Sequence, residues 1–194
     1  YETLEELGIL DETIIIFSSD NGFFFGEHGL TEKRLAYEEA IKVPFIVRYP
    51  RLIKPGTISD VLTLSIDVAP TLLEMAGIPI PSELQGQSLV PLFQGGELRQ
   101  PRSSLLFEFW PETDLPRRSC WWKAVRTDRG KFIQYYKEPF VNELYDLRTD
   151  PFEMDNLIND PDHADIVKGM TQELASLMEF YDDPGIDYRF FFDE

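Results

Sequence analysis

The stretch that decides the fold is Ile14-Ile-Ile-Phe-Ser-Ser-Asp-Asn-Gly-Phe-Phe-Phe-Gly-Glu-His-Gly-Leu-Thr-Glu-Lys33. The apolar and largely β-branched residues 13–17 predict a strand that is buried on both faces of a parallel sheet. Asp20 and Asn21 follow this strand closely, and a histidine and a lysine come soon after them. Open α/β sheets bind ligands at the carboxyl ends of their strands. The stretch therefore predicts an α/β domain with a polar site at this sheet edge.

Residues 1–100 have the texture of a βαβ-type piece of a larger sheet, with too few strands to make a parallel sheet alone. Glycines end the expected helices, and Asp67 is the expected N-cap of the longest one. The expected elements are a helix end over residues 1–8, strands over 13–17, 43–49 and 61–64, a helix over 67–77, and a helical turn near 88–93.

Residues 101–194 have a different texture, because short strands follow one another without intervening helices. Such a succession implies an antiparallel sheet. The expected strands cover 104–109, 121–127, 131–136 and 143–147, with a hairpin turn at 127–130. Asp160-Pro161 opens a helix to about Tyr181, whose apolar residues recur at helical spacing. We therefore expect two domains: residues 1–100, the C-terminal part of an α/β sheet domain, and residues 101–194, a small antiparallel sheet with one packed helix.

Composition excludes several classes of protein. The 194 residues carry a net charge of −17, which disfavours a surface for nucleic acid or for an anionic membrane. No apolar run is long enough to span a bilayer. The single cysteine, Cys120, excludes an internal disulfide and a cysteine-based zinc site. The chain starts at Tyr1 with no secretion signal, so we expect it to begin partway through a longer protein.

Asp20 and Asn21 are the candidate metal ligands. Their oxygens are hard donors that suit Ca²⁺ or Mg²⁺. Two ligands do not complete such a site, so others are expected from elsewhere. An Asp-Asn-Gly turn that merely ends a strand is the alternative, but the apolar strand before it and the polar cluster after it favour the metal site.

His28 and Lys33 are the candidate catalytic residues. Lys33 is a point charge suited to an anion, and its alternative role is that of an ordinary surface cation. His28 lies between two glycines, and its alternative role is a loop residue bonded to Glu27. Glu38 and Glu39 are expected to form a solvated face or to pair with Lys33 and Arg34. His163 is expected at the surface, and Trp121 and Trp122 either edge a pocket or belong to the core.

Several segments together resemble the sulfatase family, in the order that the family has them. The resemblance covers nearly the whole chain, so it is specific at family level, although each motif alone is weak. The matching segments are Ser-Ser-Asp-Asn-Gly (18–22), Gly-Glu-His-Gly-Leu-Thr-Glu-Lys-Arg (26–34), Tyr-Glu-Glu (37–39), Val-Pro-Phe-Ile-Val-Arg-Tyr-Pro (43–50), Ile-Asp-Val-Ala-Pro-Thr-Leu-Leu (66–73), Gln-Gly-Gln-Ser-Leu (85–89), Ala-Val-Arg-Thr-Asp (124–128) and Glu-Leu-Tyr-Asp-Leu (143–147).

The resemblance implies a formylglycine-dependent sulfatase with an alkaline-phosphatase-like fold. It implies that Asp20 and Asn21 hold Ca²⁺, that Lys33 contacts the sulfate, and that His28 lines the site. The implied substrate is a sulfated sugar or aryl sulfate, and the family suggests a periplasmic or secreted location.

The chain departs from the family pattern at the nucleophile. That motif is Cys or Ser, any residue, Pro or Ala, any residue, Arg, whereas Cys120 is followed by Trp-Trp-Lys-Ala. The formylglycine and the N-terminal acidic ligands are therefore expected outside this chain, in a missing N-terminal part of the same protein. We expect the 194 residues alone to be inactive.

Two other functions stay open from the sequence. One is a phosphodiesterase or phosphonate monoester hydrolase of the same superfamily, which shares the metal site and differs in nucleophile and pocket. The other is a non-catalytic domain that binds a ligand or partner.

Overall fold

The computed structural model describes residues 1–110, 121–136 and 140–183, so Cys120 lies outside the described residues. The chain forms two compact units. Unit 1 comprises residues 1–22 and 42–102, and unit 2 comprises residues 23–41 and 103–194. The predicted division into domains of residues 1–100 and 101–194 stays a prediction. Within this chain, residues 23–41 group with the second half.

Unit 1 contains a two-stranded sheet and short helices. β1 pairs with β2 in antiparallel register, with Phe17 opposite Ile46. The predicted parallel pairing of this strand is absent from the described chain, and the strand predicted over 61–64 does not form. The elements are α1 (Glu2–Glu6), η1 (Leu10–Glu12), β1 (Ile15–Ser18), β2 (Phe45–Arg48), η3 (Ser65–Asp67), α3 (Val68–Met75) and α4 (Val90–Phe93).

Asp67 organises the helical part of unit 1. The sequence predicts it as the N-cap of a helix, and it does occupy that position before α3, but its carboxylate does not cap α3. The fully buried carboxylate instead accepts hydrogen bonds from the amides of Leu64 and Gln87, both at 2.8 Å. Arg102 adds two further bonds of 2.7 and 2.8 Å. A bidentate, charge-assisted pair of this kind compensates the burial of a carboxylate.

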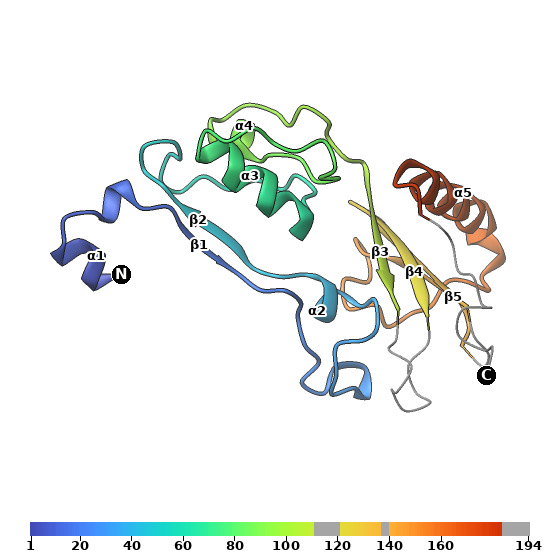
Figure 1. Cartoon of the computed structure of the whole chain (residues 1–194). Helices are drawn as coiled ribbons and strands as arrows, with labels where there is room; N and C mark the ends of the chain where they lie inside the picture. Colours follow the sequence, from blue (N-terminus) through green and yellow to red (C-terminus); the bar gives the residue numbers. More distant parts are fainter. Residues whose placement is uncertain (111–120, 137–139, 184–194) are drawn as a thin grey trace, which may run out of the picture. The chain divides into compact units, whose positions relative to one another are not determined.

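Unit 2 is built on a four-stranded antiparallel sheet, as the sequence predicts (Figure 1, where β3 to β5 are labelled). The strands lie in the order β3-β4-β5-β6. A long helix, α5, follows the sheet, and the side chain of Asp160 accepts a bond from the amide of Asp162 just before it. The elements are η2 (Glu27–Gly29), α2 (Glu38–Ile41), β3 (Ser104–Phe109), β4 (Trp122–Thr127), β5 (Gly130–Tyr135), β6 (Glu143–Asp146), η4 (Pro161–His163) and α5 (Ala164–Phe180).

Both faces of this sheet are covered. Successive side chains of a strand point to opposite faces, so each strand contributes to two clusters. On one face α5 packs through Leu174 against a cluster that comprises Val125, Phe132 and Leu144. On the other face residues 35–41 pack against a cluster that comprises Ala36, Trp122, Ala124, Ile133, Tyr135 and Tyr145. The sequence predicts the helix-covered face, whereas the cover formed by residues 35–41 is a finding of the structure.

Among the described residues, no helix combines the length and the apolar character that a membrane span needs.

Candidate functional site

The loop after β1 carries the two predicted metal ligands. Ser19 lies between the strand and these ligands, and its hydroxyl donates to Asp20 Oδ1 at 3.3 Å and to the Asn21 carbonyl at 2.8 Å. The Asn21 amide nitrogen donates to the Gly22 carbonyl at 2.7 Å. This bond fixes the orientation of the side-chain amide, and Asp20 is exposed. The loop therefore presents hard oxygen donors in an ordered turn.

The donor set of this loop fits a hard cation in chemistry but not in number. A carboxylate and an amide oxygen are the ligands that Ca²⁺ and Mg²⁺ prefer, and Ca²⁺ takes six or more. Within residues 1–110, 121–136 and 140–183, no three His, Cys, Asp or Glu side chains gather as a metal site. A cation held by Asp20 and Asn21 would therefore need further ligands.

The two predicted catalytic residues lie on the segment of residues 23–41, which belongs to unit 2, whereas Asp20 and Asn21 belong to unit 1. The segment makes a tight turn at Gly26 and Gly29, whose φ angles are 124° and 70°. His28 between them also has a positive φ of 53°, which is uncommon for a residue with a side chain. Such backbone strain persists only where the surroundings hold it.

A ring stack and a polar contact help to hold His28. Its ring stacks on that of Tyr37, with centroids 4.0 Å apart and planes 11° from parallel. Its Nε2 lies 3.4 Å from Glu39 Oε2, a buried oxygen with no hydrogen bond among the described residues. This contact ties the ring to a residue of α2. The predicted partner was Glu27, but the carboxylate of Glu27 accepts from the amide of Phe25 instead.

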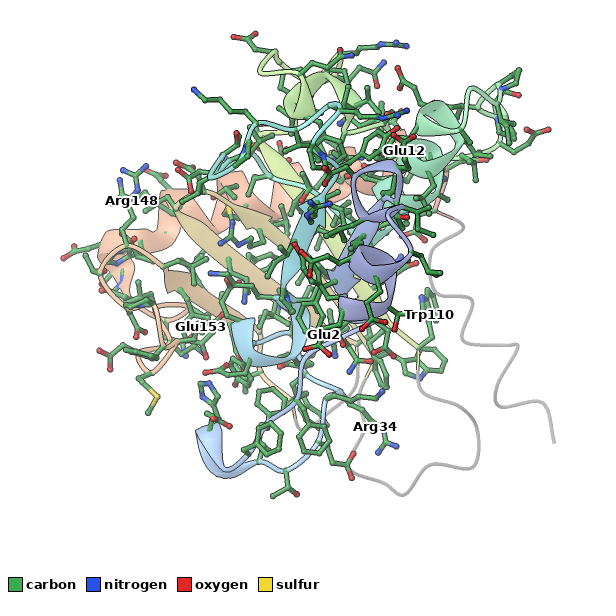
Figure 2. All side chains as sticks on the ribbon, turned by 90° about the vertical axis from the view of Figure 1, so that its left-hand side faces the viewer. Glu2, Glu12, Arg34, Trp110, Arg148 and Glu153 are labelled. Atoms are coloured by element: carbon green, nitrogen blue, oxygen red, sulfur yellow. The ribbon has the colours of Figure 1, made fainter. Side chains whose placement is uncertain are left out.

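Lys33 is exposed, whereas Glu38 and Glu39 differ from the prediction made for them. Glu38 and Glu39 were expected to face solvent or to pair with Lys33 and Arg34. The side chain of Arg34, labelled in Figure 2, pairs with Glu32 instead. Glu38 pairs with Lys131 at 2.9 Å, so this part of the segment faces the sheet of unit 2 rather than water.

Glu143 is a residue of this region that the sequence did not single out. Its carboxylate accepts from the hydroxyls of Tyr37, Tyr135 and Tyr145 at 3.2, 3.4 and 3.1 Å. Burial raises the pKa of Glu143 above its ordinary value, although the tyrosine hydroxyls oppose this. Burial also raises the pKa of Tyr37 and of Tyr145. Glu143 thus supports the ring on which His28 stacks, and only its place in a Glu-Leu-Tyr-Asp motif signalled it.

Trp121 and Trp122, for which the sequence left a core role and a pocket-edge role open, differ in burial. Trp122 belongs to the core, with 4% of its surface exposed, and its Nε1 donates to the Arg34 carbonyl at 2.7 Å. Trp121 is half-buried and lies near Trp110, with ring centroids 5.8 Å apart. The core role is therefore confirmed for Trp122.

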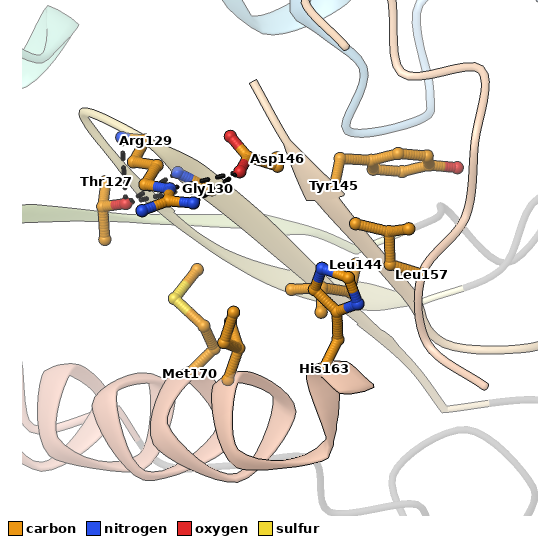
Figure 3. Close-up of a pocket in the computed structure, with 10 residues that line it drawn as sticks. Thr127, Arg129, Gly130, Leu144, Tyr145, Asp146, Leu157, His163 and Met170 are labelled. Carbon is orange, nitrogen blue, oxygen red and sulfur yellow. Dashed lines mark hydrogen bonds and ion pairs between the residues drawn. The ribbon is translucent and has the colours of Figure 1, made fainter. Parts of the chain in front are cut away.

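A pocket of about 280 Å³ opens in unit 2 between α5 and strands β4 to β6 (Figure 3). None of the predicted site residues lines it. His163, expected at the surface, is half-buried here and bonds to Asp160 at 2.9 Å. Arg129 at the rim pairs with Asp146 at 2.9 Å. The apolar side chains that line the pocket are Leu144, Leu157, Ile166 and Met170.

Known proteins resemble this chain over most of its length. The C-terminal family of N-sulphoglucosamine sulphohydrolase matches residues 26–179. An N-acetylglucosamine-6-O-sulfatase of Bacteroides thetaiotaomicron is 37% identical over 191 residues, which cover 96% of this chain and 34% of that protein. An ulvan-active sulfatase of Formosa agariphila is 32% identical, over 88% of this chain and 38% of that protein.

Solved structures agree with the sequence relatives. A protein in complex with its substrate D-glucosamine-2-N,6-O-disulfate superimposes with a TM-score of 0.89 at 36% identity, over 96% of this chain and 38% of that one. A phosphonate monoester hydrolase of Agrobacterium radiobacter gives a TM-score of 0.80 at 28% identity, over 93% of this chain and 38% of that one. The chain therefore spans about a third of the length of the relatives it matches, and it belongs to the sulfatase family, in the part described as the C-terminal region of N-sulphoglucosamine sulphohydrolase.

Proposed function

We propose that these residues are the C-terminal part of a sulfuric ester hydrolase that cleaves the sulfate ester of a sugar or an aryl alcohol. The observation that carries this proposal is the similarity to an N-acetylglucosamine-6-O-sulfatase, which is 37% identical over 96% of this chain. In this chain, strand β1 ends just before Asp20 and Asn21. A solved relative contains a disulfated glucosamine as its substrate. A sulfated amino sugar is therefore the first substrate to test.

Asp20 and Asn21 are assigned as ligands of Ca²⁺, or of Mg²⁺ in its place. The ordered turn around Ser19 supports this assignment, since preformed oxygen donors lose little freedom on binding a cation. The bound cation would supply positive charge to the sulfuryl oxygens. The remaining ligands come from outside this chain.

Lys33 is assigned as the catalytic residue that contacts the sulfate. Its ammonium group carries three donors and one charge, and it stabilises negative charge that develops on the oxygens in the transition state. His28 is assigned as a residue that lines the site around the sulfate. The stacking on Tyr37 and the contact with Glu39 hold its ring in one orientation, which supports this assignment.

The nucleophile is assigned to a formylglycine outside this chain, in an N-terminal part of the same protein. The 194 residues supply metal ligands and a cation but no Cys or Ser in the family's nucleophile motif. We therefore expect no turnover from these residues alone. Export to the periplasm or secretion is the location that the family suggests.

The experiment compares the complete polypeptide that contains these residues with its Lys33→Ala variant. Sulfate released from an aryl sulfate and from 6-O-sulfated glucosamine is measured by ion chromatography. Removing a donor to developing charge costs roughly 10²–10³-fold in kcat, so we expect a loss of that size. Lys168→Ala, at an exposed position of α5, is the matched control and should keep the wild-type rate. A wild-type rate for Lys33→Ala would contradict the assignment.

A phosphonate monoester hydrolase is the second candidate, because such an enzyme shares the fold at 28% identity. The same preparation is assayed on phenyl sulfate and on a phenyl phosphonate monoester. We expect a higher kcat/KM on the sulfate, and the reverse order would favour the second candidate. If the complete polypeptide turns over neither compound but binds Ca²⁺ in calorimetry, a non-catalytic binding domain is the better description.

A further inference from the structure

Residues 34–38, which follow Lys33, are held through their backbone at every second residue. Trp122 Nε1 donates to the Arg34 carbonyl at 2.7 Å. Lys131 Nζ donates to the Ala36 carbonyl at 2.9 Å, and the Glu38 amide donates to Glu153 Oε2 at 2.7 Å. The three holding side chains come from β4, from β5 and from the loop after β6.

The holding side chains are themselves fixed by burial. Trp122, Lys131 and Glu153 are 4%, 0% and 2% exposed. Lys131 Nζ also pairs with Glu38 Oε1 at 2.9 Å and with Glu153 Oε1 at 2.7 Å. The buried ammonium therefore has two carboxylates and a carbonyl around it, which is the surrounding that a buried charge needs.

Glu153 adopts a strained backbone to take part. Its φ of 52° lies in the left-handed region, which residues with side chains seldom occupy. Its main-chain amide bonds to the Asp150 carbonyl at 3.2 Å, so a tight turn aims its carboxylate at Lys131 and at the Glu38 amide. Strain of this kind is retained where a position has to be specified.

Packing alone does not require this network. Apolar side chains of similar volume often stabilise a core as well as a buried ion pair does. Hydrogen bonds are directional, so these polar groups specify one position of the backbone of residues 34–38. The Cα atom of Lys33 is about 3.8 Å from that of Arg34, whose carbonyl Trp122 holds. The network therefore restricts the position of the Lys33 Cα atom, from which the side chain extends.

We propose that Trp122, Lys131 and Glu153 are positioning residues that fix the backbone of residues 34–38 and thereby place Lys33. This inference rests on the proposed contact between Lys33 and sulfate. A misplacement of about 1 Å costs up to about 10²-fold in rate, so even a small shift of this backbone is measurable. The C-terminal sheet then acts on the reaction without touching the substrate.

The test is a double-mutant cycle in the complete polypeptide. Trp122→Phe keeps an aromatic ring and removes the N–H donor, and it is combined with Lys33→Ala. We expect Trp122→Phe alone to lower kcat/KM on an aryl sulfate by roughly 10-fold, and to change nothing further when Lys33 is already alanine. A role that is only structural would lower the rate by the same factor in both backgrounds, and that result would overturn the proposal.

Ser104→Ala is the matched control. It removes a hydrogen bond to Glu173 of α5, a helix that packs on the opposite face of the same sheet. We expect lower stability and an unchanged kcat/KM. If Trp122→Phe does not fold, as judged by near-ultraviolet circular dichroism, Glu153→Gln carries the same cycle, since an amide weakens the pairing with Lys131 at nearly constant volume.

The outcomes separate this inference from the proposed function. If Lys33→Ala is impaired but neither positioning variant changes the rate, positioning is wrong and the role of Lys33 stands. If Lys33→Ala keeps the wild-type rate, both the role of Lys33 and its positioning are wrong.

Discussion

The two units of this chain differ in how completely they bury their apolar residues. In unit 2 a four-stranded sheet has an apolar cluster on each face, and both clusters are closed by other parts of the chain. In unit 1 the sheet has two strands. Phe17 and Ile46, which lie opposite each other on these strands, are each 62% exposed. Further large apolar side chains of unit 1 are exposed in this chain, among them Leu7, Ile58 and Ile78.

The difference teaches that the two units derive their stability from different sources. A two-stranded sheet is marginal in water by itself, and exposed apolar area forgoes the main stabilising term of folding. Unit 1 is ordered instead around the buried carboxylate of Asp67 and its bonds to Arg102 and to two backbone amides. We infer that unit 2 is the more stable part of this chain.

Among the predicted effects, the largest should be the loss of stability of unit 2 when Lys131 is replaced with methionine. The replacement removes the cation with which the buried carboxylate of Glu153 pairs, whereas Glu38 keeps its pair with Arg126 at 3.3 Å. Loss of a buried partner of this kind costs about 3–5 kcal/mol in the free energy of unfolding. All three tryptophans lie between residues 110 and 122, so urea unfolding followed by tryptophan fluorescence reports on unit 2. Arg148→Ala, which breaks an exposed pair with Asp128, should cost at most about 1 kcal/mol. Equal losses would refute the account of the network.

Replacing Gly86 with alanine tests the order within unit 1. A Cβ atom there would lie 2.0 Å from the Ile66 carbonyl oxygen, beside the Asp67 turn. Forcing an atom into such a space costs about 1–3 kcal/mol, and we expect faster cleavage of unit 1 in limited proteolysis. Gly169→Ala in α5 is the control, because open space surrounds its Cβ and helix propensity should stabilise it by up to about 1 kcal/mol. Unchanged proteolysis of Gly86→Ala would mean that the turn is not held tightly.

A smaller effect is expected from the pH dependence of unit 2. Burial raises the pKa of Glu143 above its ordinary value of 4.5, so the folded state binds this proton more tightly than the unfolded state. The contribution of Glu143 to the free energy of unfolding should therefore be full below pH 4.5 and decrease as the pH rises from there through the raised pKa. Glu143→Gln should lack this decrease, so its difference from the wild type should vary with pH in that window. A constant difference would show that Glu143 titrates normally.

Regular patterns made much of this fold predictable. The succession of short strands in residues 104–147, without intervening helices, predicted all four strands of unit 2, and helical spacing predicted α5. These elements are predictable because they follow from local sequence patterns. The strand predicted over 61–64 failed, since the backbone there turns so that the Leu64 amide meets Asp67. That contact depends on the burial of the Asp67 carboxylate, and no local sequence pattern predicts this burial.

The site was predictable in its residues but not in its supports. Asp20, Asn21, His28 and Lys33 were chosen from their residue types, spacing and resemblance, and their roles stay predictions. The ties of residues 34–38 to Lys131 and Glu153 join positions about a hundred residues apart in the chain. A lysine in a strand and a glutamate in a turn carry no local sign that they will be buried. Such partners become visible only when the fold brings them together.

Amide hydrogen exchange of the 194-residue chain, read by mass spectrometry, tests the central claim most directly. We predict slow exchange in β3 to β6, in α5 and in residues 36–41, and fast exchange in β1, β2 and α3. Residues 36–41 should lose their protection together with the sheet in Lys131→Met. Fast exchange of residues 36–41 beside a protected sheet, or protection of unit 1 equal to that of unit 2, would contradict the account.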